Sequence, residues 1–162
     1  MINVLDWDDY KNYFAFAIVR NPFDRLVSWW NMMLHKGICN DFSRYLLTQA
    51  SNFSEFLDSI DIIDEMHPFE RVGLLPYPKS IAFNQMDYIT AKDGRMAMNF
   101  VGRFENLETD FEQICNTIGI KMHLPHANAY KKNNYREYYG PEEILKVQSM
   151  YQRDLEHFGY AF

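Results

Sequence analysis

The chain has 162 residues, of which 48% are hydrophobic and 17% aromatic, and its formal net charge at pH 7 is −6. This length and composition predict one globular domain over residues 1–162 and exclude a disordered chain. No apolar run approaches the roughly 20 residues of a membrane span, and the acidic balance disfavours a general nucleic-acid or anionic-membrane binder.

The first twelve residues form a short acidic lead-in without the basic start and apolar core of a signal peptide. The two cysteines, Cys39 and Cys115, leave a disulfide open, but a chain of this size does not need one. A reduced, cytoplasmic protein is therefore the simpler prediction.

The apolar run Tyr13–Val19 is rich in aromatic and β-branched residues and predicts a strand buried on both faces of a parallel sheet. A helix follows, with Asn21 as its cap, Pro22 in its first position and Asp24 in its first turn. Its predicted buried face consists of Phe23, Leu26, Val27, Trp30, Met33 and Leu34.

Three polar residues of this strand–turn–helix segment are candidates for a binding site. Arg20 lies at the carboxyl end of the strand, where open α/β sheets bind ligands, and Arg25 and Ser28 lie on the helix. A helix N-terminus beside a guanidinium suits a phosphate. The alternative is an ordinary strand-end arginine and a solvated serine.

Residues 20–28 read RNPFDRLVS, and this string resembles the 3′-phosphate-binding motif of sulfotransferases that use 3′-phosphoadenosine 5′-phosphosulfate (PAPS) as sulfuryl donor. The resemblance implies that Arg20 and Ser28 bind the 3′-phosphate of PAPS. It also implies an α/β fold with a parallel sheet flanked by helices, similar to nucleotide kinases. The family carries a loop for the 5′-phosphosulfate upstream of this motif, with the usual catalytic base between the two. Residues 1–12 resemble neither, so we expect a truncated fold.

Basic His35 and Lys36 before Gly37 predict the end of the helix, with His35 as a helix-end cation. Two short helices should follow, over Asp41–Ala50 and Phe53–Ile60. Ser51 or Asn52 is expected to cap the second, whose inner face is formed by Phe53, Phe56, Leu57 and Ile60. The acidic residues nearby have no metal-ligand spacing and indicate a solvated face; they are Asp58, Asp61, Asp64 and Glu65.

Residues 67–80 contain three of the six prolines and predict a loop, which in the family faces the acceptor. Residues 81–89 are similar to a family segment in which Gln85, Asp87 and Tyr88 match, while a histidine and a proline do not.

The string NFVGRFENL at residues 99–107 is a second match to the carbohydrate-type sulfotransferases. It predicts a second parallel strand that ends at Arg103 and then a helix, a mainly architectural role. Arg103 could reach the nucleotide or pair with Glu105 or Glu108. Gly119 should end the helix, and its predicted buried stripe is Leu107, Phe111, Ile114, Cys115 and Ile118.

Residues 124–139 are similar to the family's C-terminal donor loop, and Lys131, Lys132 and Arg136 with nearby aromatic rings suit an adenine nucleotide. The alternative is a basic surface loop without a ligand. Pro141 then begins a final helix, with a packed stripe of Ile144, Val147, Tyr151, Leu155 and Phe158.

The resemblance implies transfer of a sulfuryl group from PAPS to a hydroxyl or amine, on a carbohydrate-type acceptor. No residue stands out as the catalytic base, and without the 5′-phosphosulfate loop we expect no turnover by this chain alone. The alternatives are a non-catalytic protein that binds 3′-phosphoadenosine nucleotides and an assembly protein.

Loss of the neighbouring strand would leave Tyr13–Val19 with an open edge, and such edges pair with other chains. Residues 1–12 could cover this edge, but a homodimer is the favoured expectation. An exposed Trp29 or Trp30 would strengthen that tendency.

Overall fold

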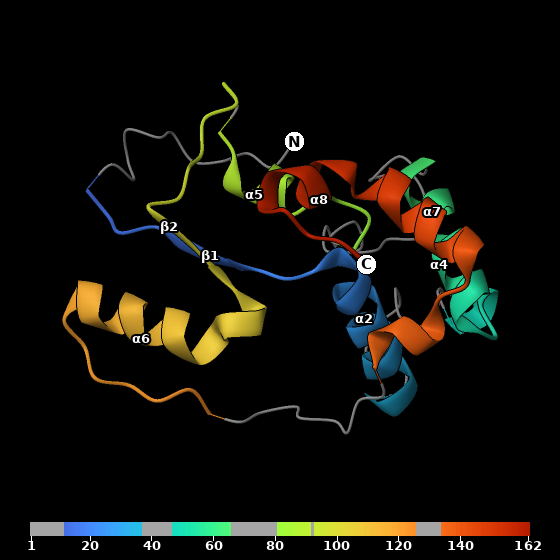
Figure 1. Cartoon of the computed structure of the whole chain (residues 1–162), viewed down its shortest axis with the longest axis horizontal. Coiled ribbons are helices and arrows are strands. Elements are labelled where there is room, and N and C mark those ends of the chain that lie inside the picture. The colour runs from blue at the N-terminus through green and yellow to red at the C-terminus, as the bar shows by residue number, and fades with distance from the viewer. Residues whose placement is uncertain (1–11, 37–46, 66–80, 92, 126–133) are drawn as a thin grey trace. The chain divides into compact units, whose positions relative to one another are not determined.

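The computed structural model describes residues 12–36, 47–65, 81–91, 93–125 and 134–162 (Figure 1). The chain divides into two compact units. The sheet unit contains residues 1–21 and 85–132, and the helical unit contains residues 22–84 and 133–162.

The sheet unit is built on two parallel strands, β1 (Phe16–Val19) and β2 (Phe100–Arg103). Helix α5 (Met86–Ile89) precedes β2, and the 3-10 turn η2 (Phe104–Asn106) leads from β2 into helix α6 (Leu107–Ile118). Helix α6 packs beside β2 (Figure 1). This arrangement confirms the predicted α/β class, with helices beside a parallel sheet.

Gly102 allows α6 and β1 to pack closely against β2. A Cβ atom at this position would lie 2.7 Å from Cδ1 of Ile18 and 3.0 Å from Cβ of Asp110. The carboxylate of Asp110 also accepts a hydrogen bond from the main-chain N–H of Arg103. The glycine of the second motif is therefore a packing requirement of the sheet.

The apolar run before Arg20 forms less strand than predicted. Strand β1 begins at Phe16 rather than Tyr13, and these two side chains are 44% and 68% exposed. A strand buried on both faces was therefore the wrong prediction. A continuous apolar run marks such a strand when wide layers cover both faces of its sheet, and the sheet of the described residues has two strands.

The helical unit contains α2 (Pro22–Lys36), α4 (Phe53–Glu65), the 3-10 turn η3 (Tyr135–Tyr138), α7 (Pro141–Met150) and α8 (Gln152–Phe158). Its core is formed mainly by the inner faces of α2, α4 and α7. The buried members are Phe23, Leu26, Val27, Trp30, Met33, Ala50, Phe53, Phe56, Leu57, Ile60, Ile81, Val147 and Tyr151.

Most predicted helix signals of this unit are confirmed. Helix α2 begins at Pro22 with Asp24 in its first turn. Asn52 caps α4, because its Oδ1 accepts a hydrogen bond of 3.0 Å from the main-chain N–H of Glu55. Helix α4 runs beyond the predicted Ile60 to Glu65. The final predicted helix is interrupted at Tyr151, which separates α7 from α8.

Two predicted core residues are solvent-exposed, Leu34 by 52% and Ile118 by 44%. Each lies in the last turn of its helix. The remaining members of the α6 stripe are buried or half-buried, and α6 ends as predicted at Gly119, whose φ of 77° is left-handed.

Several predictions fall outside the described residues: the part of the predicted helix Asp41–Ala50 that covers residues 41–46, the loop over residues 67–80, and Cys39. Residues 47–49 of that predicted helix are helical. Cys115 is a buried free thiol.

Candidate functional site

Arg20 lies at the carboxyl end of β1. The pairing of Val19 with Arg103 brings the carboxyl ends of β1 and β2 to the same edge of the sheet, so Arg20 and Phe104 follow neighbouring strand ends. Parallel sheets of α/β proteins bind ligands at this edge. Arg103 itself is exposed, and a role for it at the nucleotide stays a prediction.

The main chain of Arg20 is held by one distant side chain. Oε1 of Gln85 accepts a hydrogen bond of 2.9 Å from the N–H of Arg20, and Nε2 of Gln85 donates one of 2.8 Å to its carbonyl. The guanidinium carbon lies 4.1 Å from the centre of the Phe104 ring. Arg20 is half-buried, and its Nη2 atom is shielded from solvent.

Ser28 lies in the second turn of α2, in the helical unit, and is half-buried. Helix α2 begins with Pro22 and Phe23, and both of these residues are buried. Ser28 is thus fixed on a helix that is anchored along its apolar face.

Arg25 has a structural contact in the same unit. Its Nη1 donates a hydrogen bond of 3.1 Å to the carbonyl of Phe83, and its guanidinium carbon lies 5.9 Å from the centre of the buried Tyr151 ring. The hydroxyl of Tyr151 donates to the carbonyl of Ile81. Arg25 and Tyr151 therefore both hold the segment around residues 81–84, and a contact of Arg25 with a nucleotide stays a prediction.

Arg136 is the described member of the predicted basic loop, since Lys131 and Lys132 lie outside the described residues. It is exposed on η3, where its guanidinium carbon lies 4.8 Å from the Tyr135 ring and 5.6 Å from the Phe162 ring. Its N–H donates to Oδ1 of Asn134 at 3.1 Å. A cation beside two aromatic faces suits a nucleotide.

Tyr139, next to this loop, is a structural residue. Its hydroxyl donates a hydrogen bond of 2.7 Å to the carbonyl of Phe23 in the first turn of α2. Burial, with smaller contributions from Tyr151 and Asp24, raises the pKa of Tyr139 far above its usual value. It therefore stays protonated and cannot serve as a base near neutral pH.

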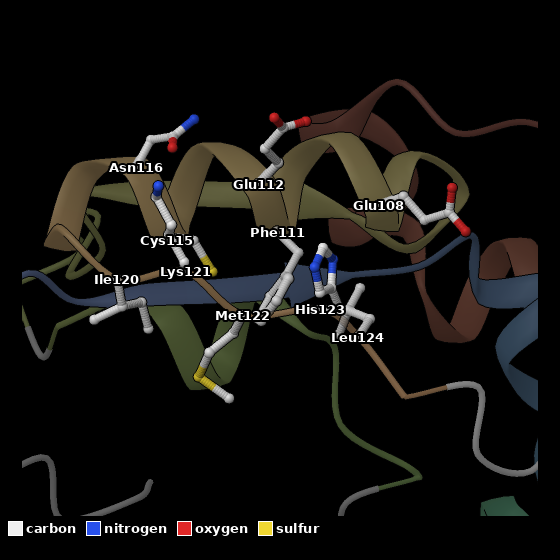
Figure 2. A pocket seen from close by; sticks show the side chains of 10 residues that line it. All are labelled: Glu108, Phe111, Glu112, Cys115, Asn116, Ile120, Lys121, Met122, His123 and Leu124. Atoms are coloured by element: carbon white, nitrogen blue, oxygen red, sulfur yellow. The ribbon is translucent and has the colours of Figure 1, made fainter.

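The sheet unit also carries a pocket of about 540 Å³ between α6 and the chain that follows it (Figure 2). Glu108, Glu112 and Asn116 lie along one side of the helix in this view. The full lining is Glu108, Phe111, Glu112, Cys115, Asn116, Ile120, Lys121, Met122, His123 and Leu124. Glu108 and Glu112 place two carboxylates one helical turn apart in this lining, against the one lysine Lys121, and such a balance does not favour phosphate groups.

Within the part of the chain that the structure describes, no three histidine, cysteine, aspartate or glutamate residues form a metal-binding group. Asp58 of the predicted acidic cluster is paired with Lys146 at 2.7 Å, which agrees with a solvated face. Among the described helices, none is both long and apolar enough to cross a membrane.

Sequence reasoning found Arg20 through its motif but missed the groups that hold it. Gln85 matches a family segment that indicates no role for it, and the string that contains Phe104 and Glu105 predicts a mainly architectural segment. The side chain of Glu105 accepts a hydrogen bond of 2.8 Å from the N–H of Asn21, so this second motif also contacts the end of β1.

In a comparison with known families, the model described as "Sulfotransferase family" matches residues 5–161. Searches of curated proteins and of solved structures gave no match. The family match includes both motifs and nearly the whole chain.

Proposed function

Because the chain belongs to the sulfotransferase family, we propose that it binds PAPS as donor and acts in the transfer of a sulfuryl group to a hydroxyl or amine of a carbohydrate-type acceptor. The observation that carries this proposal is the placement of Arg20 at the carboxyl end of β1, with its main chain bonded to Gln85 and its guanidinium over Phe104. An arginine fixed in this way is suited to a phosphate.

Each basic or polar residue of the site has a proposed task. Arg20 pairs with the 3′-phosphate, and the Ser28 hydroxyl donates a hydrogen bond to it. Lys131, Lys132 and Arg136 neutralise the remaining phosphate charge, and the rings beside Arg136 pack against the nucleotide. Arg25 contributes positive charge near the start of α2, in addition to its bond to Phe83.

The proposed reaction needs little covalent chemistry from the protein. The acceptor oxygen or nitrogen forms a bond to sulfur while the bond from sulfur to the 5′-phosphate oxygen breaks. A base takes the acceptor's proton, and 3′,5′-adenosine bisphosphate leaves. The described residues bear on donor binding, and we assign no catalytic base.

The test compares 3′,5′-adenosine bisphosphate with AMP by calorimetry, because only the former carries a 3′-phosphate. We expect the bisphosphate to bind more tightly, and Arg20→Ala to weaken its binding by about 1.5–3 kcal/mol, the range for a hydrogen bond to a charged group. The matched control is Arg95→Ala, since Arg95 is an arginine of the same unit with a 69% exposed side chain paired to Asp93.

Equal affinity of the wild-type chain for the two nucleotides would refute the proposed donor site. A loss in Arg95→Ala as large as that in Arg20→Ala would show that general positive charge, rather than Arg20, attracts the bisphosphate.

The second candidate is a protein that binds the same nucleotide without catalysis. The site residues described above serve this candidate equally well, because the tasks proposed for them concern binding of the nucleotide. Both candidates share the nucleotide site and differ in turnover.

A further inference from the structure

The main chain that leaves β1 is bonded to side chains from distant parts of the sequence. The side-chain amide of Gln85 pairs with both the N–H and the carbonyl of Arg20, at 2.9 and 2.8 Å. The carboxylate of Glu105 accepts from the N–H of Asn21 at 2.8 Å. Three consecutive polar groups of the main chain thus have side-chain partners just beyond the last residue of the strand.

A double hydrogen bond from one amide restricts the backbone more than two separate bonds do. The oxygen and nitrogen of an amide have a fixed spacing, so the N–H and carbonyl of Arg20 must keep one relative geometry to reach both. That geometry fixes φ and ψ of Arg20 and hence the direction in which its side chain leaves the strand. The amide of Gln85 therefore supplies the main-chain hydrogen bonds that a neighbouring strand would supply if β1 continued past Val19.

The side chain of Arg20 is restricted as well. Phe104 follows the last residue of β2, and its ring lies beneath the guanidinium at 4.1 Å. A cation over an aromatic face is attracted to it. The N–H groups at the edge of the planar guanidinium point along the guanidinium's own plane. A free arginine side chain loses rotamer entropy when a ligand immobilises it, and contact with Phe104 removes part of that loss before the ligand arrives.

We infer that Gln85, Phe104 and Glu105 are positioning residues that act through Arg20. This inference rests on the proposed function, in which Arg20 recognises the 3′-phosphate. Gln85 and Glu105 fix the main chain, and Phe104 fixes the guanidinium. The 3′-phosphate-dependent part of nucleotide affinity should therefore depend on all three, whereas the affinity for AMP should not.

The decisive quantity is the ratio of the affinities for 3′,5′-adenosine bisphosphate and AMP. We expect Gln85→Ala and Phe104→Leu each to lower the affinity for the bisphosphate about tenfold, the size of one or two net hydrogen bonds or a partly desolvated cation–π contact. Binding of AMP should change less than about twofold in both variants. The matched control is Gln113→Ala, an exposed glutamine on α6 of the same unit, which should leave the ratio unchanged.

The two variants together separate a loss of folding from a loss of positioning. Gln85→Ala removes two main-chain partners and could unfold the end of the sheet, which urea unfolding would reveal. Phe104 is 43% exposed, so Phe104→Leu leaves the core intact and still removes the aromatic face. If Gln85→Ala does not fold, the affinity ratio in Phe104→Leu decides.

The outcomes separate this inference from the proposed function. A wild-type chain that binds both nucleotides equally refutes the donor site itself. If the wild type prefers the bisphosphate and the folded variants keep that preference, the positioning role is overturned. An equal loss for both nucleotides would likewise overturn it, because a merely structural defect has that effect.

Discussion

At the scale of single residues, Tyr139 links the C-terminal part of the helical unit to the start of α2. Its ring meets Phe23, Phe53 and Phe162 edge-on, with centroid distances of 5.3, 5.0 and 5.5 Å. Edge-to-face contacts and the bond to the Phe23 carbonyl hold the first turn of the helix that carries Arg25 and Ser28.

We expect Tyr139→Phe to lower the free energy of unfolding by about 1 kcal/mol, because the ring packing stays and one partly buried hydrogen bond is lost. Urea unfolding at neutral pH measures this. Tyr138→Phe is the control, since the hydroxyl of Tyr138 makes a longer bond of 3.2 Å to Oδ1 of Asn31. A larger loss in Tyr138→Phe than in Tyr139→Phe would contradict the assignment.

The raised pKa of Tyr139 also makes the free energy of unfolding depend on pH. Because the pKa of Tyr139 is raised by folding, its contribution to stability is complete below the ordinary tyrosine value of 10.0 and decreases as the pH rises above it. Tyr139→Phe should therefore lose less stability than the wild type in that alkaline range.

At the scale of elements, two polar contacts align α4 with α7. Oγ of Ser54 donates to Oε1 of Glu143 at 2.8 Å, and Nζ of Lys146 lies 2.7 Å from Oδ1 of Asp58. The other oxygen of Glu143 accepts from the N–H of Gly140 at 2.9 Å and so caps the start of α7. Glu143 thus joins two helices and closes the end of one.

The hydrogen bond from Ser54, followed by those from the main chain of Glu143 itself and of Gly140, lowers the pKa of Glu143 below the usual 4.5. A carboxylate with a lowered pKa stabilises the fold above its ordinary pKa and loses this effect as the pH falls through the lowered value. We expect Glu143→Gln to flatten the decline of stability below about pH 4.5, measured by urea unfolding at several pH values. Glu142→Gln, an exposed neighbour in the same turn, should decline like the wild type; a flatter curve in this control would contradict the role of Glu143.

The elements show what sequence patterns can predict. Periodic signals located α2 and its buried residues from Phe23 to Met33, because a helix that packs along its length must repeat its apolar side chains. The pattern failed for Leu34, which lies on the same stripe but in the last turn of α2. Periodicity gives the direction of a side chain and not the length over which a partner covers the helix.

The candidate site likewise contains one part that sequence patterns predict and one part that they do not. Arg20 was found because its motif is local, whereas Gln85 lies 65 residues away along the chain. One amide that bonds to a main chain produces no periodic pattern. Its partner is set by the pairing of distant strands, and no local signal in the sequence encodes that pairing.

At the scale of the whole molecule, the exposed strand bears on assembly. Among the described residues β1 pairs with β2 alone, and Phe16 is 44% exposed. Neither tryptophan adds to this tendency, because Trp30 is buried and Trp29 is partly buried against the core. The case for association therefore depends on the strand.

We expect a homodimer that involves the β1 edge, because a strand edge that has no partner among the described residues can pair with another chain. Light scattering at micromolar concentration should give twice the monomer mass, and Phe16→Lys should shift it towards the monomer. Leu145→Lys, at a 67% exposed leucine on α7, is the control and should stay dimeric. A clean wild-type monomer would refute this expectation.

A second expectation for the whole chain concerns turnover. Since residues 1–12 show no phosphate-loop pattern, we expect these 162 residues to bind the donor without transferring its sulfuryl group. Labelled PAPS with a panel of glycans tests this, and one acceptor labelled above background would establish catalysis by the chain itself.

The bonds at the end of β1 also determine when this region can form during synthesis. The main-chain N–H of Arg20 bonds to a side chain 65 positions later in the sequence, and that of Asn21 to one 84 positions later. Closing such long loops is entropically unfavourable, and pairings of this kind form slowly compared with helices. The chain leaves the ribosome with its N-terminus first, so β1 emerges well before β2. A nascent chain that stops short of residue 104 therefore carries Arg20 without its complete set of partners, and Arg20 acquires its full set only after β2 has been made.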